Sequence, residues 1–388
     1  MLTDMFPSKD TPAEGTFVYE LVRQLVKSCE IDLIHPRFWY PFGGSDQQVD
    51  AEREYEWVEP SLCPTFRPKL FIPPQGDRVF LRGIAFLISM IPYLLKKHQE
   101  SKYDIVHAHM AVPAGFAGVL AAIISKRPIL ITCHGSDIHT YPHYHYLRFM
   151  VSYVLRRAQR VVFVSNALLE SATREGFSPK GASVIHNGVD QSKFIPADKA
   201  VHRKKLGLAS GDQVVLYVGH LLPVKGLTFL MDAFADLRKR ISSVQLVLVG
   251  KGQLESELKR QAFALGIAQD VRFVGQIPHS EIPSWINACD VFCLPSINEG
   301  FPTVIPEALS CGRPVVASRV GGIPEIITST VQGILVPPRD RVELSYALEV
   351  ALKSKWDKAA ISASVSGYSW EAIAAEYMAL YEAMVQKS

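Results

Sequence analysis

The sequence lacks several features that would place it in a specialised class of protein. Its six cysteines form no C-x-x-C pair, no D-x-D motif occurs, and no low-complexity tract is present. The longest apolar stretch, residues 83–95, is too short to cross a bilayer and contains Pro92. A net charge of +3 is too small to indicate nucleic acid as a partner. The sequence therefore indicates a globular protein without a disulfide framework or a cysteine metal site.

The cysteines fit buried thiols in a reducing cytosol, which predicts a cytoplasmic protein. The first residues lack a basic start and a long apolar core, so no signal peptide is expected. Residues 1–4 fit the last part of a first strand whose beginning is missing. Basic residues flank residues 83–95, and a buried core helix is favoured there over an interfacial one. Peripheral contact of the protein with the inner membrane surface stays an open alternative.

The length predicts two domains. A chain of 388 residues is too long for one ordinary core and fits two domains of about 190 residues. Strand and helix patterns alternate, which indicates α/β domains with parallel sheets. We place the boundary near Pro196, which gives domains over 1–195 and 196–368. A final helix in 369–388 is expected to return to the first domain.

The most informative stretch is 289–325. Residues 291–294 are apolar without alternation, which predicts a central parallel strand covered on both faces. Pro302 suits the first turn of a helix, so we expect that helix to begin near 300–302. Unpaired N–H groups at this helix N-terminus would form a binding site for a phosphate, and Gly300 would let the phosphate approach the backbone closely.

Two carboxylates, Glu299 and Glu307, flank this predicted phosphate-binding site. A carboxylate repels a diphosphate, so hydroxyl groups are their expected partners, those of a sugar for one and of a ribose for the other. With its flanks, this Glu299-x7-Glu307 pattern resembles the retaining glycosyltransferases of family 4. The resemblance rests on Glu-Gly-Phe-Pro-x-Val-x-x-Glu-Ala at 299–308 and continues through 312–325. An isolated E-x7-E would favour a solvated helix, but the flanking residues favour the family.

The resemblance implies a GT-B architecture, with two Rossmann-like domains facing a cleft. The first domain would hold the acceptor and the second the donor. Glu299 would contact the sugar and Glu307 the ribose. The loop between them would complete the donor site through Gly300, Phe301, Pro302 and Thr303.

Two motifs in the first half extend the resemblance. Residues 128–133 predict a strand that ends in His134-Gly-Ser-Asp137, similar to the family's H-G-x-D motif, whose histidine lies against the transferred sugar. Gly15 precedes a predicted helix and resembles the glycine loop that faces the donor phosphate and the acceptor. His107 and His109 lie near the end of another predicted strand, at the edge where parallel sheets bind ligands.

One motif in the second half departs from the family pattern. After a predicted strand at 214–218, Lys225 occupies the position of the family's phosphate-binding lysine, but His220 stands where an arginine is usual. Arginine clamps two phosphate oxygens and stays charged, whereas histidine loses its proton near neutrality. A protonated His220, another basic residue, or weaker activity could each account for the change. Ile277 resembles the backbone cradle for the base.

The resemblance implies a hexosyltransferase that moves a sugar, with retention, from a nucleoside-diphosphate sugar to an acceptor hydroxyl. A UDP-sugar donor and a carbohydrate or lipid-linked acceptor are expected, in polysaccharide or glycolipid biosynthesis. No cofactor or metal is expected, because D-x-D is missing and His139, His143 and His145 lack partners at metal-ligand spacing. Without a clear protein nucleophile, same-face attack is favoured, with Glu299 and His134 positioning the sugar.

Three alternatives remain open from the sequence. The first two keep the GT-B fold and are a sugar-nucleotide epimerase and an inverting transferase. The third is a weakly active paralogue that binds nucleotide sugars, suggested only by His220.

Overall fold

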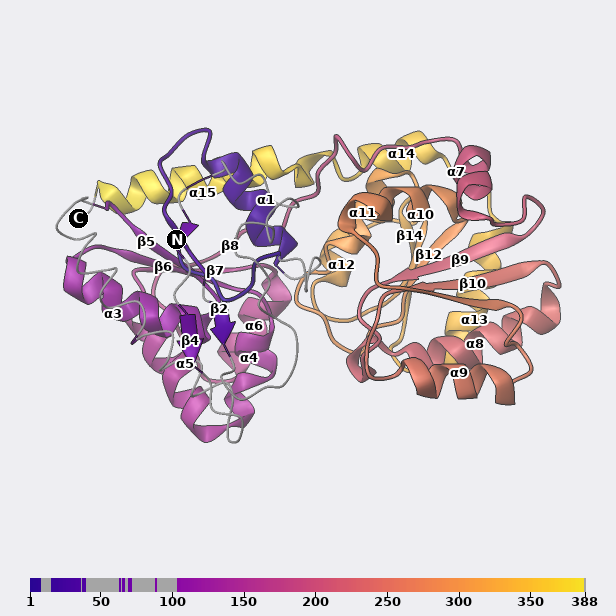
Figure 1. The fold of residues 1–388 in the computed structure, drawn as a ribbon, viewed down its shortest axis with the longest axis horizontal. Helices are drawn as coiled ribbons and strands as arrows, with labels where there is room; N and C mark the ends of the chain where they lie inside the picture. The colour runs from indigo at the N-terminus through magenta and orange to yellow at the C-terminus, as the bar shows by residue number, and fades with distance from the viewer. Residues whose placement is uncertain are drawn as a thin grey trace. The chain divides into compact units, whose positions relative to one another are not determined.

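The computed structural model describes residues 1–7, 15–35, 37–39, 63, 65–66, 69–71, 88 and 103–386. The chain divides into two units (Figure 1). Unit 1 comprises Met1–Asn187 and Trp370–Ser388, and unit 2 comprises Gly188–Ser369. This division falls before the boundary near Pro196 predicted from the sequence. The apolar stretch 83–95 lies outside the described residues, apart from Ile88.

Unit 1 is built on parallel strands. Leu2 bridges to Ile34 on one side and to Ala108 on the other, in the position of the strand predicted at 1–4. The order across the sheet is therefore β3-β1-Leu2-β5-β6-β7-β8, and β2 pairs with β4 separately. The strands are β1 Leu33–Ile34, β2 Arg37–Trp39, β3 Thr65–Phe66, β4 Lys69–Phe71, β5 Val106–His109, β6 Ile129–Cys133, β7 Arg160–Phe163 and β8 Ala182–Val184.

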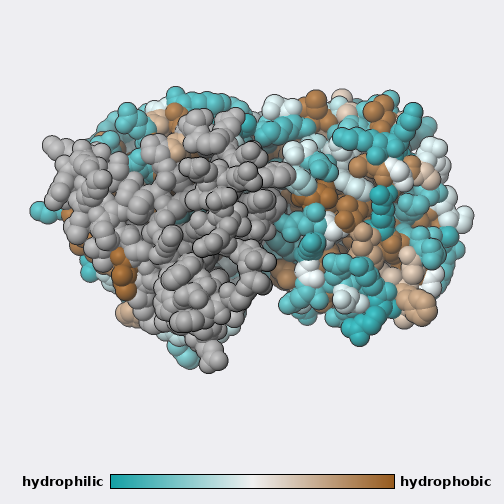
Figure 2. Space-filling model, viewed as in Figure 1, coloured by the Kyte–Doolittle hydropathy of each residue, from teal (hydrophilic) through white to brown (hydrophobic). Residues whose placement is uncertain are grey.

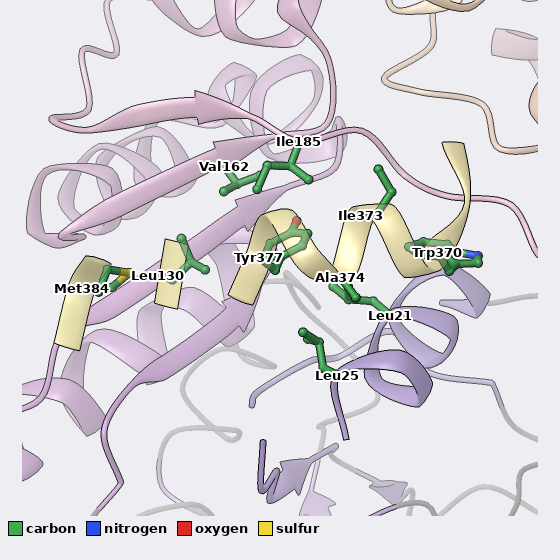
Figure 3. Close-up of a cluster of buried hydrophobic side chains, with 10 residues drawn as sticks. All are labelled: Leu21, Leu25, Leu130, Val162, Ile185, Trp370, Ile373, Ala374, Tyr377 and Met384. Carbon is green, nitrogen blue, oxygen red and sulfur yellow. The ribbon is translucent and has the colours of Figure 1, made fainter. Parts of the chain in front are cut away.

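The helices of unit 1 come from both ends of the chain. They are α1 Thr16–Leu25, η1 Ala111–Gly115, α3 Phe116–Ser125, α4 Ser136–His139, η2 Tyr141–His143, α5 His145–Arg157, α6 Asn166–Arg174 and α15 Trp370–Val385. Figure 1 shows α15 running beside α1, and the two helices are in contact. Ile373 and Tyr377 of α15 join Leu21 and Leu25 of α1 in one buried cluster (Figure 3). Apolar burial therefore attaches the C-terminal helix to unit 1.

Unit 2 contains one six-stranded parallel sheet in the order β11-β10-β9-β12-β13-β14. Its strands are β9 Gln213–Val218, β10 Val244–Val249, β11 Val271–Gly275, β12 Val291–Leu294, β13 Val315–Ser318 and β14 Gly333–Val336. All four residues of β12 are buried, as its continuous apolar run predicted. The expected central parallel strand is therefore confirmed.

Helices cover both faces of this sheet. Figure 1 shows α8, α9 and α13 on one face, with α10 and α11 on the other. The helices are α7 Lys199–Leu206, η3 Pro223–Lys225, α8 Leu227–Arg240, α9 Glu255–Ala264, η4 His279–Glu281, α10 Ile282–Ala288, α11 Val304–Ser310, α12 Ile323–Ile326, α13 Arg341–Lys353, α14 Lys358–Ala363 and η5 Ser366–Tyr368. Both units thus combine parallel strands with helices, the α/β organisation predicted from the alternating strand and helix patterns.

The surface of unit 2 in Figure 2 mixes hydrophilic and hydrophobic residues in small groups. Its exposed large apolar side chains come from several helices, among them Phe263 on α9 and Tyr346 on α13. Scattered apolar residues of this kind are ordinary on a protein surface. Within the described part of the chain, no helix has both the length and the apolar character needed to span a bilayer.

Candidate active site

The strand order of unit 2 reverses between β9 and β12. The chain continues from β9 to β10 and β11 on one side, whereas β12 to β14 lie on the other. In open parallel sheets, ligands bind outside the carboxyl ends of the strands at such a reversal. The loop after β9 carries Lys225, and the loop after β12 carries Glu299. The two donor-binding segments predicted from the sequence therefore meet where this sheet would bind a ligand.

Two glycines allow the loops at this edge to touch. Gly226 has φ +66°, and a Cβ at this position would lie 2.1 Å from the carbonyl oxygen of Pro295. Gly321 has φ +51°, and its Cβ would lie 1.8 Å from the carbonyl oxygen of Glu299. No other residue tolerates both the backbone conformation and the contact. A backbone hydrogen bond of 2.8 Å from Ile297 to Val224 further joins the two loops.

The side chains of Lys225 and Glu299 form an ion pair. Lys225 Nζ lies 2.7 Å from Glu299 Oε1, and the Ser296 hydroxyl donates to the same oxygen at 2.6 Å. Their side chains are 22% and 9% exposed, so water screens the pair only in part. The ammonium expected to bind phosphate thus contacts the carboxylate expected to bind sugar. The sequence motifs did not reveal the Ser296 contact.

His220 lies in the same loop as Lys225, at the surface. Its backbone carbonyl accepts a hydrogen bond of 2.8 Å from the hydroxyl of Tyr217. Burial raises the pKa of Tyr217 well above its ordinary value, and the nearby charge of Glu299 raises it further. Tyr217 is therefore a neutral hydrogen-bond donor that holds the loop bearing His220.

The second carboxylate of the motif, Glu307, contacts a histidine from another loop. Glu307 is buried on α11, and its Oε1 lies 2.9 Å from His279 Nε2. His279 opens η4, two residues after Ile277. The loop predicted to cradle the base is therefore joined to the carboxylate predicted to bind the ribose. His279 was not predicted from the sequence, although it lies only two residues after Ile277.

The start of α11 differs from the prediction. The helix begins at Val304, with Thr303 as its N-cap, two residues after the start predicted near 300–302. Pro302 precedes the helix, and its carbonyl oxygen accepts the N–H of Ile305 at 3.1 Å. The remaining loop residues are placed by contacts within unit 2. The carbonyl of Gly300 accepts from Gly322 at 3.1 Å, and the Phe301 ring lies 5.8 Å from that of Tyr368.

In unit 1, Asp137 organises the turn that carries His134. Its carboxylate accepts the backbone N–H of His134 at 2.9 Å and that of Ala111 at 2.5 Å. These bonds connect the end of β6 to the segment that follows β5. Burial raises the pKa of Asp137 to about 6, although the backbone hydrogen bonds oppose the rise.

The glycine loop lies beside His134. Gly15 has φ +66°, and a Cβ there would lie 2.4 Å from the carbonyl group of Met5. The helix that follows places the Phe17 ring 4.4 Å from the imidazole of His134, centroid to centroid. Burial lowers the pKa of His134 to about 3, so its imidazole is neutral at physiological pH. The structure thus brings together the two unit 1 motifs predicted from the sequence.

Among the described residues, no group of three or more histidine, cysteine, aspartate or glutamate side chains is arranged to hold a metal ion.

Family models match both halves of the chain. Residues 15–193 match the model described as Glycosyltransferase Family 4, and residues 198–364 match Glycosyl transferases group 1. TuaC of Bacillus subtilis, a glycosyltransferase named for teichuronic acid biosynthesis, is 30% identical over 361 residues, 89% of this chain and 87% of that protein. A D-inositol 3-phosphate glycosyltransferase of Geodermatophilus obscurus is 29% identical over 75% of this chain and 69% of its own length.

Solved structures share the fold over almost the whole chain. Sucrose-phosphate synthase from Thermosynechococcus elongatus has a TM-score of 0.76 at 24% identity, covering 96% of this chain and 94% of that one. HepE from Anabaena, in complex with UDP, also has a TM-score of 0.76, at 23% identity, covering 98% of this chain and 99% of that one. With two parallel-sheet α/β units, the chain fits the GT-B architecture of these glycosyltransferases.

Proposed function

Because this chain belongs to the family 4 glycosyltransferases of the group 1 type, we propose that it is a retaining hexosyltransferase that uses a nucleoside-diphosphate sugar. The observation that carries the proposal is the meeting of Lys225 and Glu299 at the strand reversal of unit 2. The ammonium would stabilise the leaving diphosphate, and the carboxylate would accept hydrogen bonds from sugar hydroxyls. Both groups would act at the bond that breaks.

The nucleoside part of the donor is assigned to the neighbouring loops. Glu307 would accept the ribose hydroxyls, while His279 holds its carboxylate in place. The backbone at Ile277 would contact the base. HepE was solved in complexes with UDP and with UDP-glucose, which supports a UDP-sugar as the donor proposed for this chain.

Retention is proposed to occur by same-face attack. The acceptor oxygen forms a bond to the anomeric carbon while the bond from that carbon to the diphosphate oxygen breaks. The acceptor proton passes to the leaving diphosphate. Glu299 Oε1 already accepts hydrogen bonds from Lys225 and Ser296. These bonds stabilise the carboxylate and make it a weak nucleophile, so Glu299 suits a role in holding the sugar, the role also proposed for His134.

Leaving-group stabilisation is proposed to need no metal ion. The Lys225 ammonium would face the leaving diphosphate, and α8 begins two residues after Lys225, at Leu227. The start of α8 has no side-chain cap, so its first N–H groups and the helix dipole favour an anion there. Activity should then persist in excess chelator. Loss of activity with chelator and its return with manganese or magnesium would refute this part of the proposal.

The acceptor is proposed to be a carbohydrate or a lipid-linked carbohydrate, in polysaccharide or glycolipid biosynthesis. The name of TuaC supports this class of acceptor. We propose a cytoplasmic site of action with peripheral contact to the inner membrane surface through α5, where exposed Phe149 lies near Arg156. Phe149→Ser should reduce sedimentation with anionic vesicles, and equal sedimentation of both proteins would refute the contact.

A panel of nucleotide sugars tests the donor assignment. A ligand present at a hundred times its dissociation constant stabilises the folded protein by about 2.7 kcal/mol, which raises the melting temperature measurably. The stabilising donor is then incubated with candidate acceptors, and the anomeric configuration of the product is read by NMR. A product of inverted configuration would exclude retention. Conversion of the sugar nucleotide without an acceptor would indicate an epimerase, and binding without turnover would favour the weakly active paralogue.

A further inference from the structure

The carboxyl end of β5 places a second histidine against His134. β5 and β6 pair in parallel, with His109 opposite Thr132, so the end of β5 lies beside the turn that follows β6. His109 Nδ1 lies 3.0 Å from His134 Nε2, and the two rings are inclined by only 23°. His109 is 1% exposed, so water does not compete for this hydrogen bond.

Burial keeps both imidazoles neutral. It lowers the pKa of His134 to about 3 and that of His109 well below its ordinary value. The charges of His107 and His134 would lower the pKa of His109 further. A neutral imidazole has one N–H donor and one acceptor nitrogen, and its tautomer is set by the hydrogen bonds it makes. The two rings must therefore hold complementary tautomers.

We propose that His109 is a positioning residue that fixes the tautomer and the ring orientation of His134. This inference rests on the proposed function, because His134 is there assigned to the donor sugar. The hydrogen bond occupies His134 Nε2 and sets the plane of its ring. Among the described residues, the buried Nδ1 of His134 and the buried Nε2 of His109 have no hydrogen-bond partner. A single tautomer of the pair therefore decides whether His134 Nδ1 donates to a sugar hydroxyl or accepts from it.

Other contacts hold β5 in place behind His109. The ring of His107 lies 4.4 Å from that of His109, centroid to centroid. His107 Nδ1 lies 2.7 Å from the hydroxyl of Tyr381 on α15, and its Nε2 lies 2.9 Å from the hydroxyl of Thr132 on β6. His107 therefore uses both ring nitrogens in the scaffold. His109 instead directs a ring nitrogen toward the residue assigned to the sugar.

NMR of protein labelled with ¹⁵N-histidine tests the hydrogen bond directly. In the parent protein we expect a scalar coupling between His109 Nδ1 and His134 Nε2, and a single neutral tautomer of His134. A variant His134→Gln assigns the signals. Absence of the coupling in the parent protein, or a mixture of tautomers there, would overturn the inference. This measurement needs no turnover, so it stands apart from the test of the proposed function.

Three variants separate positioning from scaffolding. His109→Phe keeps an aromatic ring but removes the hydrogen bond, so we expect His134 to show both tautomers. His109→Asn places an amide near the original Nδ1 and should restore a hydrogen bond to His134 Nε2. His107→Phe is the matched control on the same strand and should leave the tautomer of His134 unchanged. A single tautomer in His109→Phe, equal to that of the parent protein, would contradict the proposal.

Kinetics supply a second readout. His109→Phe should lower kcat about two- to tenfold, which is the effect of losing one neutral hydrogen bond. His109→Asn should recover part of that loss. The affinity for free nucleoside diphosphate should stay constant, because His109 is not among the contacts assigned to the nucleotide. Equal losses of kcat and of nucleotide affinity in His109→Phe would indicate general unfolding instead of positioning.

Discussion

Acidification should weaken unit 1 through the buried groups around His134. The folded-state pKa of His134, about 3, lies below its ordinary value of 6.5. The unfolded chain therefore binds the proton more tightly, and stability is lost as the pH falls below 6.5. Between pH 7.5 and 5.0 this loss amounts to about 2 kcal/mol. His107 and His109 act in the same direction, because burial lowers their pKa values too.

Protonation of Asp137 opposes this loss of stability on acidification. Its pKa is raised from 3.8 to about 6, so the folded state binds the proton more tightly than the unfolded state between these values. Protonation of Asp137 between pH 7.5 and 5.0 therefore raises the free energy of unfolding by about 1.4 kcal/mol. Asp137→Asn removes this titration. The variant should lose about 1.4 kcal/mol more than the parent protein over the same change of pH.

The Asp137→Asn substitution also lowers the free energy of unfolding by an amount that does not depend on pH. The carboxylate of Asp137 accepts N–H groups from His134 and Ala111, and an asparagine can accept only one of them with its single oxygen. One buried N–H would then face an NH₂ group, which costs about 1–3 kcal/mol. Because this cost is the same at both pH values, it cancels when the two pH responses are compared.

Hydrogen exchange in urea measures the free energy of opening for each part of the chain. Peptides covering β5 and β6 report on unit 1, and exchange rates are corrected for the intrinsic effect of pH. Peptides covering β9 and β12, which contain no histidine, serve as the internal control. Equal pH responses in the parent protein and in Asp137→Asn, or an acid loss in unit 1 no larger than in unit 2, would refute the reasoning.

Further predictions concern the donor site of unit 2. Glu307→Ala should weaken binding of the free nucleoside diphosphate by about 1.5–3 kcal/mol in calorimetry, because a charged hydrogen bond to the ribose is lost; unchanged affinity would remove Glu307 from the site. Glu299→Ala should spare the free nucleotide but weaken binding of the intact donor, and equal losses for both ligands would contradict its assignment to the sugar. Lys225→Met should lower kcat more than Lys225→Arg does, since only the arginine keeps a charge for the leaving group; equal rates would argue against that role. His220→Arg should match or exceed the parent rate, and His220→Gln should lose about one to two orders of magnitude if a charge-assisted bond is lost; a glutamine variant with the parent rate would show that His220 is not used.

Segments with a strong local pattern could be predicted from the sequence. The apolar run at 291–294 identified β12, and the alternation of strands and helices identified two α/β units. The start of α11 was predicted two residues too early, because Pro302 and Pro306 each fit the first turn of a helix. Pro306, not Pro302, lies in that turn, where its missing N–H leaves no carbonyl of the helix unpaired. Either proline alone would have fitted the pattern.

Contacts between distant segments could not be predicted in the same way. Lys225 and Glu299 are 74 residues apart, and the pairing of their side chains depends on the order of strands in the sheet. Hydrophobic periodicity carries no information about that order. The hydrogen bond between His109 and His134 likewise depends on β5 and β6 being neighbours. The sequence pattern predicted which residues follow a strand. Which strands are neighbours in the sheet is known only from the structure.

The candidate site residues of unit 2 are charged, whereas the histidines at the candidate site of unit 1 are neutral. In unit 2, the side chains assigned to the donor are ionic, since Lys225 pairs with Glu299 at the reversal of the sheet. In unit 1, the imidazole of His134 is neutral, and so is that of His109 behind it. A diphosphate needs a cation, whereas a sugar hydroxyl needs a defined donor or acceptor and gains little from a charge. Under the proposed function, unit 2 therefore supplies the electrostatic stabilisation of the leaving group, and unit 1 supplies a tautomer that orients the transferred sugar.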